Sequence, residues 1–243
     1  MNTPFLSIII PAHNEENRLP RTLKQVFAFL KKQTYTSEVI VVENGSSDRT
    51  LELAMQFVQE HANLVVIQEH NKGKGNAVRR GMLAARGDFR FICDADLSMP
   101  IEDLEKFLPP ALENFDVAIG SREAPGAIRY NEPSYRHIGG RAINLAIRTL
   151  ILPGLNDTQC GFKCFRAKTT EDLFQKQTLM GWSFDIELLY LARRKKLNIR
   201  EIPIHWYYDP DSKVSAVRDA MRMIGDIFRI HLNAIRGMYD SQP

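Results

Sequence analysis

Residues 5–31 read FLSIIIPAHNEENRLPRTLKQVFAFLK, and this stretch decides the fold class. Its first part, Phe5–Ile10, is a short apolar run rich in isoleucine, which is typical of a buried strand. The last part, Arg18–Lys31, is amphipathic, and its apolar residues recur at helical spacing: Leu19, Leu23, Val26, Phe27 and Leu30. A polar turn separates the two parts. The stretch therefore predicts a strand followed by a helix, the repeating unit of α/β proteins.

The same alternation continues along the first half of the chain. Further strands are expected at residues 38–42, 64–68, 89–93 and 117–119, and helices at 48–61, 75–85 and 101–113. Apolar strands that alternate with amphipathic helices predict a parallel sheet covered on both faces. The second half is less regular, with helices expected at 135–152, 184–196 and 214–238 and strands at 162–165 and 199–207. We expect a single domain, residues 1–243, with a soft boundary near residue 120 between a nucleotide-binding half and an acceptor half.

Composition excludes several classes of protein. The chain has 243 residues, of which 44% are apolar and 25% charged, as in ordinary soluble globular proteins and unlike disordered or collagenous ones. The net charge of +3 is too small to imply a nucleic-acid partner, and we predict none. Three cysteines, Cys93, Cys160 and Cys164, form no even framework, so we expect free thiols in a reducing compartment.

We also expect no membrane-spanning segment. The longest stretch without Asp, Glu, Lys or Arg is Met1–Asn14, which prolines interrupt, whereas a transmembrane helix needs about 20 apolar residues. The start of the chain lacks the basic region of a signal peptide. The sequence therefore predicts a cytoplasmic protein, or one that rests on a membrane surface.

Polar segments follow four of the expected strands: residues 11–16, 43–48, 71–76 and 94–96. Ligands of open α/β sheets bind outside the carboxyl ends of the strands, so we expect these segments to line one site. Neither the phosphate-binding loop of nucleotide triphosphatases nor the Gly-x-Gly-x-x-Gly fingerprint of dehydrogenases is present. A kinase of that type and a Rossmann dehydrogenase are therefore disfavoured.

Two of these segments carry carboxylates with a candidate role. Asp94 and Asp96, one residue apart at a strand end, can both reach a hard cation such as Mg²⁺ or Mn²⁺. The alternative is a solvated turn that caps the next helix. Glu43 lies where a carboxylate can accept the imide N–H of uracil, whereas the alternative is a tight turn at residues 43–48 with Asp48 as the helix cap.

Taken in order, these motifs resemble the family 2 glycosyltransferases of the GT-A fold. The matching segments are Ile10–Glu15, Val41–Asp48 and the Asp94-x-Asp96 triplet. Residues 71–75, 94–97, 120–122, 157–163 and 212–214 further resemble the dolichyl-phosphate glucosyltransferase branch, and the likeness covers residues 5 to about 215. The resemblance implies a Rossmann-like, mostly parallel central sheet with helices on both faces and a less regular acceptor-side half.

The resemblance also implies roles for single residues. Those implied to hold the nucleotide-sugar are Pro11, Ala12, Glu15 (on the ribose), Glu43 (on the base), Lys74 and Gly75 beside it, and Asp94. Asp94 and Asp96 are implied to bind Mg²⁺ or Mn²⁺. The chain departs from the family at two places: Glu43-Asn44 replaces the usual Asp-Asp, and Ser98 replaces the Gln of related mannosyltransferases.

An acceptor that is a lipid phosphate is already an oxyanion near neutral pH, because its second pKa is about 6. Such a nucleophile needs cations to position it, and arginine is well suited. The candidates are Arg122, Arg136, Arg141 and Lys213. For Arg136 and Arg141 the alternative is that they cover the solvated face of a helix.

Asp157 is the candidate catalytic carboxylate, which would orient the sugar, stabilise developing positive charge or act as a base. Asp185 and Glu187 are a second possibility, although two residues so spaced on a helix do not share a face. The helix at 214–238 carries a stripe that we expect to pack against the domain, made of Val217, Met221, Ile224, Ile227, Phe228 and Ile235.

The resemblance thus implies an inverting, metal-dependent enzyme that moves a hexose, expected to be glucose, from a UDP-sugar to a polyprenyl (dolichyl-type) phosphate. Its expected location is the cytoplasmic face of a membrane. Two alternatives stay open: a transferase with a hydroxyl acceptor, as in polysaccharide or glycolipid synthesis, and a nucleotide-sugar-binding module without turnover.

Overall fold

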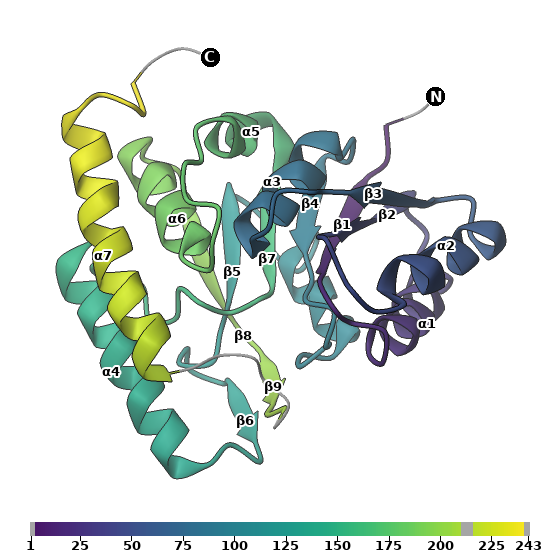
Figure 1. The fold of residues 1–243 in the computed structure, drawn as a ribbon, viewed down its shortest axis with the longest axis horizontal. Helices are drawn as coiled ribbons and strands as arrows, with labels where there is room; N and C mark the ends of the chain where they lie inside the picture. Colours follow the sequence, from purple (N-terminus) through teal and green to yellow (C-terminus); the bar gives the residue numbers. More distant parts are fainter. Residues whose placement is uncertain (1–2, 210–215, 241–243) are drawn as a thin grey trace.

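The computed structural model describes residues 3–209 and 216–240, without the side chains of 134–138, 140, 142, 143 and 216–220. Its centre is a seven-stranded sheet of order β3-β2-β1-β4-β7-β5-β8 (Figure 1). The strands are β1 (Leu6–Ala12), β2 (Ser37–Glu43), β3 (Leu64–Gln68), β4 (Phe89–Ile92), β5 (Val117–Ser121), β7 (Lys163–Arg166) and β8 (Ile199–Pro203). All run parallel except β7, which is antiparallel to both neighbours. The predicted mostly parallel sheet is therefore confirmed.

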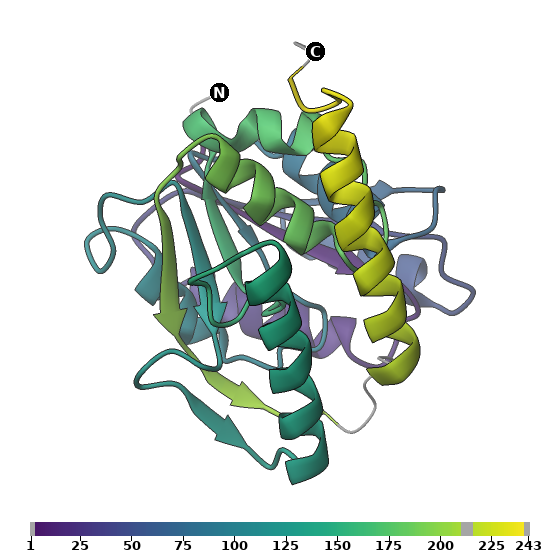
Figure 2. The same cartoon turned by 90° about the vertical axis from the view of Figure 1, so that its left-hand side faces the viewer.

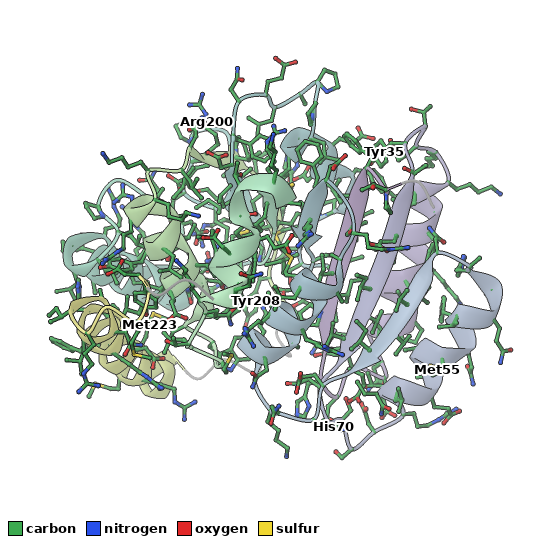
Figure 3. All side chains as sticks on the ribbon, turned by 90° about the horizontal axis from the view of Figure 1, so that it is seen from above. Tyr35, Met55, His70, Arg200, Tyr208 and Met223 are labelled. Carbon is green, nitrogen blue, oxygen red and sulfur yellow. The ribbon has the colours of Figure 1, made fainter. Side chains whose placement is uncertain are left out.

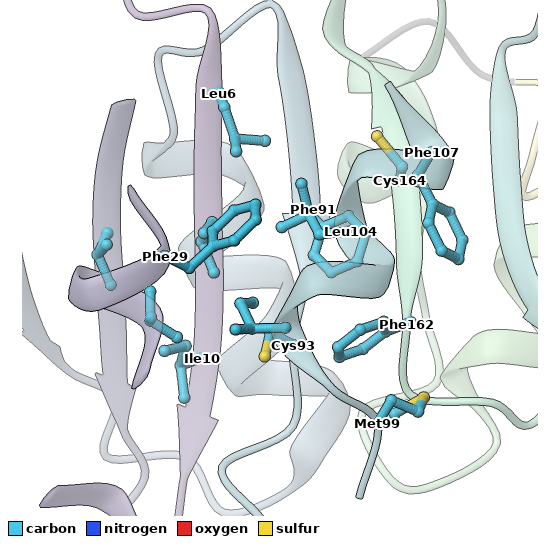
Figure 4. Packing of buried hydrophobic residues seen from close by; sticks show 14 of the residues in the cluster. Leu6, Ile10, Phe29, Phe91, Cys93, Met99, Leu104, Phe107, Phe162 and Cys164 are labelled. Atoms are coloured by element: carbon cyan, nitrogen blue, oxygen red, sulfur yellow. The ribbon is translucent and has the colours of Figure 1, made fainter. Parts of the chain in front are cut away.

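Helices cover both faces of the sheet, as predicted. One face packs against α1 (Leu19–Leu30), α2 (Thr50–Glu60) and the 3₁₀ helix η1 (Ile101–Phe107). The other packs against α3 (Lys74–Ala84), α4 (Ser134–Leu150), α5 (Ala167–Gln175), α6 (Phe184–Arg194) and α7 (Ala216–Ile235). Successive side chains of β1 point to opposite faces: Ile8 and Ile10 join the first cluster and Ile9 the second. Figure 4 shows Ile10 within the first cluster.

Several elements differ from the expectation. The helix expected at 101–113 is a 3₁₀ helix that ends at Phe107, because Pro109 and Pro110 cannot continue a helix. The strand expected at 199–207 is two strands, and the second, β9 (His205–Tyr207), leaves the main sheet and pairs with β6 (Ile128–Tyr130). The rings of Tyr130 and Tyr207 stack with centroids 4.4 Å apart across this ribbon.

α4 and α7 lie side by side at one end of the molecule (Figures 1 and 2), where the His231 imidazole is 3.2 Å from the carbonyl oxygen of Leu150. The expectation that the apolar stripe of this last helix packs against the domain is wrong for most of it. Phe228 is 67% exposed and Ile235 84%, while Ile227 is buried. Ile227 packs instead in a row with Met223 and Ile230, which supplies the buried face, and the side chain of Val217 lies outside the described part.

No helix in the described part of the chain is both long and apolar enough to cross a membrane.

Candidate active site

The site lies at the carboxyl edge of the sheet, where β1 and β4 are neighbours and the strand order reverses. Figure 3 shows the two edges: Tyr35 precedes β2 at one, and His70 follows β3 at the other. The reversal is the position at which open α/β sheets bind ligands. It brings the turn after β1 beside the Asp94-Ala95-Asp96 turn after β4, as the sequence predicts. The Thr22 hydroxyl of α1 fixes the second turn by donating to the carbonyl oxygen of Ala95 at 2.6 Å.

Asp94 forms an ion pair with Lys74, the first residue of α3, at 2.6 Å. Burial by itself would lower the pKa of Lys74, but the carboxylates of Asp94 and Asp185 raise that pKa above its ordinary value. Behind Asp94 lies Gly161: a Cβ there would sit 2.0 Å from the Asp94 carboxylate. A glycine is thus required at 161 for Asp94 to hold this position. The structure places the ammonium of Lys74 on Asp94, and its predicted place beside the base stays a prediction.

The Asp94–Asp96 pair fits a divalent cation. The surrounding protein and the charge of Asp94 together raise the pKa of Asp96, whose side chain is nevertheless open to solvent. A carboxylate whose ionisation is disfavoured by a neighbouring negative charge gains from a nearby cation. Among the described residues, no cluster of three or more His, Cys, Asp or Glu side chains forms a metal cage. The donor set is therefore of the kind in which Mg²⁺ or Mn²⁺ also takes phosphate and water oxygens.

A second lysine–carboxylate pair lies near the first: Asp185 was a candidate in the sequence, but its pairing with Lys163 was not predicted. Lys163 is buried, and its ammonium is 3.0 Å from Asp185 while it also donates to the carbonyl oxygen of Cys160. Burial raises the pKa of Asp185, which Lys163 and Lys74 partly offset. Glu187 faces elsewhere, as the spacing predicts: it accepts hydrogen bonds from the backbone N–H of Thr178 and the hydroxyl of Tyr239.

The loop before α6 closes over the start of α3. Gly73 and Gly75 allow this contact, because a Cβ on either would lie under 3 Å from backbone atoms of Met180. The loop carries Trp182, which is 44% exposed and whose ring centroid lies 5.2 Å from the Lys74 ammonium. The sequence analysis did not predict Trp182 as a site residue. Its position, next to Gly181 and just before a helix, was the feature that could have indicated it.

The turn after β2 holds the predicted base-binding residue. Glu43 is buried, and its Oε1 accepts a hydrogen bond from the Ser46 N–H at 2.5 Å. No hydrogen bond within the described residues uses its second oxygen. Asp48 accepts from the backbone N–H of both Glu16 and Thr50, which ties this turn to the one after β1. The structure thus forms the turn that the sequence offered as an alternative, while the base-binding role of Glu43 stays a prediction.

Asn44, where the family usually has aspartate, connects two loops. Its amide donates to the carbonyl oxygens of Glu69 and Asn71 at 2.9 and 2.8 Å, and its own oxygen accepts from the Gly73 N–H at 2.8 Å. Only an amide both donates and accepts in this way. Asn44, which departs from the family pattern, thus anchors the loop that leads into α3.

The remaining donor-side candidates lie at the end of β1. Pro11 and Ala12 are part of the strand itself, and the carbonyl oxygen of Ala12 accepts from the Asn44 N–H. Glu15 follows in the turn, where the Arg18 guanidinium donates two hydrogen bonds to its carboxylate at 2.6 and 2.9 Å. Arg18 also reaches Asp209 at 2.9 Å. The structure thus places Glu15 at the predicted edge, in an ion pair.

On the acceptor side, Asp157 and Arg122 form a bidentate ion pair. The Arg122 guanidinium donates to the two Asp157 oxygens at 2.7 and 2.9 Å, and the Arg122 backbone N–H donates at 3.0 Å. Burial alone would raise the pKa of the fully buried Asp157, but Arg122 lowers it to about 2. The Arg122 guanidinium also lies over the ring of Trp206, 5.4 Å from its centroid. Two residues predicted for separate roles therefore neutralise each other.

The other predicted acceptor cations are less completely placed. Arg141 is exposed on α4 and lines a hollow of about 360 Å³ with Arg148, Glu123, Asn156 and others. Glu123 and Asn156 are the chain neighbours of Arg122 and Asp157, so Arg141 lies near this ion pair. Arg136 lies on α4, but its side chain is outside the described part, and Lys213 lies outside the described residues altogether.

A family model described as glycosyl transferase family 2 matches residues 7–174. The chain belongs to this family. A dolichyl-phosphate beta-glucosyltransferase of Drosophila melanogaster is 35% identical to it over 249 residues, with 96% of this chain and 76% of the relative covered. The protein of the same name from Homo sapiens is 32% identical, with 98% of this chain and 78% of the relative covered.

The fold of this family 2 glycosyltransferase is also similar to solved structures. Glucosyl-3-phosphoglycerate synthase from Mycobacterium tuberculosis, crystallised with Mn²⁺, UDP-glucose and phosphoglyceric acid, superposes with a TM-score of 0.65 at 16% identity, over 93% of this chain and 79% of that one. This likeness confirms the predicted GT-A fold. The predicted family and the fold class are therefore both correct, while the residue roles stay predictions.

Proposed function

We propose that this family 2 glycosyltransferase moves glucose from UDP-glucose to a polyprenyl (dolichyl-type) phosphate, with inversion at the anomeric carbon, at the cytoplasmic face of a membrane. Relatives that are 32–35% identical over nearly the whole chain carry the name dolichyl-phosphate beta-glucosyltransferase. Structural neighbours were crystallised with UDP-glucose and Mn²⁺, or with UDP and Mg²⁺, which supports the proposed donor and cofactor.

The observation that carries the acceptor assignment is the Arg122–Asp157 ion pair. A carboxylate whose pKa is about 2 is a poor general base near neutral pH. A hydroxyl acceptor would need such a base, whereas a phosphate monoester is already an oxyanion and needs to be positioned. Asp157 therefore suits a phosphate acceptor. Arg122 and Asp157 would form part of the wall of the site, and neither would transfer a proton.

On the donor side, each residue binds or orients. Glu43 would accept the imide N–H of the base through its second oxygen, and Lys74 holds Asp94 in place by the 2.6 Å ion pair. Asp94 and Asp96 would hold Mg²⁺ or Mn²⁺, which would neutralise charge on the departing UDP. The exposed ring of Trp182, beside Lys74, would border the donor on this side.

The direct test is transfer by the purified chain with MnCl₂, UDP-glucose and polyprenyl phosphate. We expect a glucosylated lipid phosphate, with little product when polyprenol replaces polyprenyl phosphate or when GDP-mannose replaces UDP-glucose. Equal glucosylation of polyprenol would favour a hydroxyl acceptor, and UDP-glucose binding without product under any condition would favour a binding module.

Glu43→Gln is expected to weaken UDP binding by about tenfold or more, because a charge-assisted hydrogen bond contributes on the order of 1.5–3 kcal/mol. Isothermal titration calorimetry with UDP measures the effect. Glu60→Gln, which changes an exposed carboxylate at the end of α2, is the matched control. An unchanged UDP affinity for Glu43→Gln would remove this residue from the base site.

Arg141→Glu is expected to raise the KM for polyprenyl phosphate about tenfold or more and to leave the KM for UDP-glucose nearly unchanged, since it reverses a charge that borders the acceptor side only. Arg200→Glu, on β8, makes the same charge change at an exposed position elsewhere. If Arg141→Glu raises both KM values in parallel, this arginine belongs to the donor site instead.

A further inference from the structure

α7 has two apolar rows on different faces. One row, Met223, Ile227 and Ile230, is buried against the domain. The second consists of exposed large apolar side chains at the helical spacing of three and four, and we call it the outer row: Met221, Ile224, Phe228, Leu232 and Ile235. A helix that only packed on the domain would need one apolar face. The outer row therefore requires its own explanation.

A row of arginines runs beside the outer row. Arg222 and Arg229 of α7 and Arg236, the residue directly after it, are spaced by seven residues, so they lie along one side of the helix, and all three are exposed. None of the three forms an ion pair with any residue in the described part of the chain. By contrast, Arg194 of α6 is paired at 2.6 Å with Asp240, which follows α7. The three arginines thus present positive charge that the described protein does not neutralise.

The neighbouring helix α4 repeats this combination. Leu145 and Leu150 are exposed, and so are Arg141 and Arg148. α4 and α7 lie side by side at one end of the molecule (Figure 2). Exposed large apolar residues and exposed arginines therefore occur together on two adjacent helices.

We propose that the outer row of α7 and its arginines Arg222, Arg229 and Arg236 are a docking surface for an anionic lipid bilayer. An interfacial helix inserts Phe, Leu, Ile and Met side chains into the acyl boundary while its arginines contact lipid phosphates. A second copy of the chain is a poorer occupant, because pairing two outer rows would bring like-charged arginine rows together at the rim.

The docking surface extends the proposed function. It depends on that proposal in one point, namely that the acceptor is a membrane lipid. α4 carries the predicted acceptor residues Arg136 and Arg141, and Lys213 precedes α7 by three residues in the sequence. The helices that would contact the bilayer are thus the ones that carry or adjoin the predicted acceptor cations. A lipid phosphate would reach the site without leaving its membrane.

The test is co-sedimentation of the whole chain with vesicles, without any sugar nucleotide. We expect binding to an equal mixture of phosphatidylcholine and phosphatidylglycerol, and much weaker binding to phosphatidylcholine alone. Phe228→Ser should weaken binding about tenfold, because it removes a large inserted side chain. Replacing Arg222, Arg229 and Arg236 together by glutamine should weaken it about a hundredfold, since each arginine near an anionic surface contributes about fivefold.

Matched controls lie at the opposite end of the molecule. Met55→Ser changes an exposed apolar residue of α2, far from α7 (Figure 3). Replacing the exposed Lys24, Lys31 and Lys32 by glutamine, at or just after α1, removes the same net charge. Both controls should bind vesicles as the wild type does, and circular dichroism should show all variants to be folded.

Equal effects of the controls and the α7 variants would overturn the proposal, as would binding that does not depend on phosphatidylglycerol. So would an absence of vesicle binding together with self-association, measured by light scattering, that Phe228→Ser abolishes; the second copy would then be the occupant. Vesicle binding with no glucosyl transfer would instead contradict the proposed function and leave the docking surface standing.

Discussion

Glucosyl transfer is expected to stop in EDTA, to return with Mg²⁺ or Mn²⁺, and to fall about a hundredfold or more in Asp96→Asn. The reason is electrostatic: negative charge develops on the leaving group. In a water-poor site, a bound cation lowers the energy of that charge by several kcal/mol. Asparagine keeps an oxygen that can accept the 3.0 Å hydrogen bond from the Ser98 N–H, so the turn after β4 should stay in place. The readouts are the initial rate of transfer and the binding of Mn²⁺ with UDP by calorimetry.

The control for this prediction is Asp116→Asn, because Asp116 likewise accepts a backbone hydrogen bond, from the Asn198 N–H, and lies before β5, outside the predicted site. Its rate should match that of the wild type, and both variants should unfold at the wild-type temperature. Full turnover in EDTA, or an Asp96→Asn variant as active as the wild type, would contradict metal binding by this pair.

Arg122→Ala should lower the free energy of unfolding by about 3–5 kcal/mol, since it leaves the carboxylate of Asp157 buried without its partner. The double variant Arg122→Met with Asp157→Leu should be much less destabilised than Arg122→Ala, because no unpaired charge is left in the interior. Urea unfolding of the wild type, Arg122→Met, Asp157→Leu and the double variant gives the coupling energy of the pair. A loss below about 1 kcal/mol in Arg122→Ala would mean that solvent reaches the pair and weakens it.

The same ion pair gives the protein an acid-sensitive contribution to stability. The pKa of Asp157 in the folded protein, about 2, lies below its ordinary value of 3.8, so its contribution is fully present above about pH 4 and is lost as the pH falls toward 2. The loss amounts to about 2 kcal/mol, because lowering a pKa by one corresponds to about 1.4 kcal/mol. The double variant should lose that much less stability than the wild type over this pH range.

The elements with strong periodicity could be predicted, and those that depend on tertiary contacts could not. β3 has the predicted bounds, Leu64–Gln68, because its apolar run is flanked by polar residues on both sides. β6 was missed because three residues at the surface carry no readable pattern, and it exists only through its pairing with β9. In α7 the sequence contained two apolar rows, and nothing local decided which one would pack.

The location of the candidate site could be predicted from the sequence, but the contacts between its residues could not. Strand-end polar segments had to meet at one edge once the sheet was parallel, which is why residues 11–16 and 94–96 were assigned together. The ion pairs Lys74–Asp94 and Arg122–Asp157 join residues far apart in the chain, and no spacing rule encodes such distances. Gly161 was part of a matched motif, but its function, making room for Asp94, is visible only in three dimensions.

The antiparallel strand β7 has a consequence for how the chain folds during synthesis. β5 ends at Ser121, yet both of its partners, β7 and β8, come later in the sequence, and β7 is also what covers the open edge of β4. Until residue 166 has left the ribosome, the open edge of β4 and both edges of β5 therefore remain unpaired, and open strand edges promote aggregation. The halves on either side of residue 120 are thus interleaved in one sheet, and neither half folds to its final form before the other has been made.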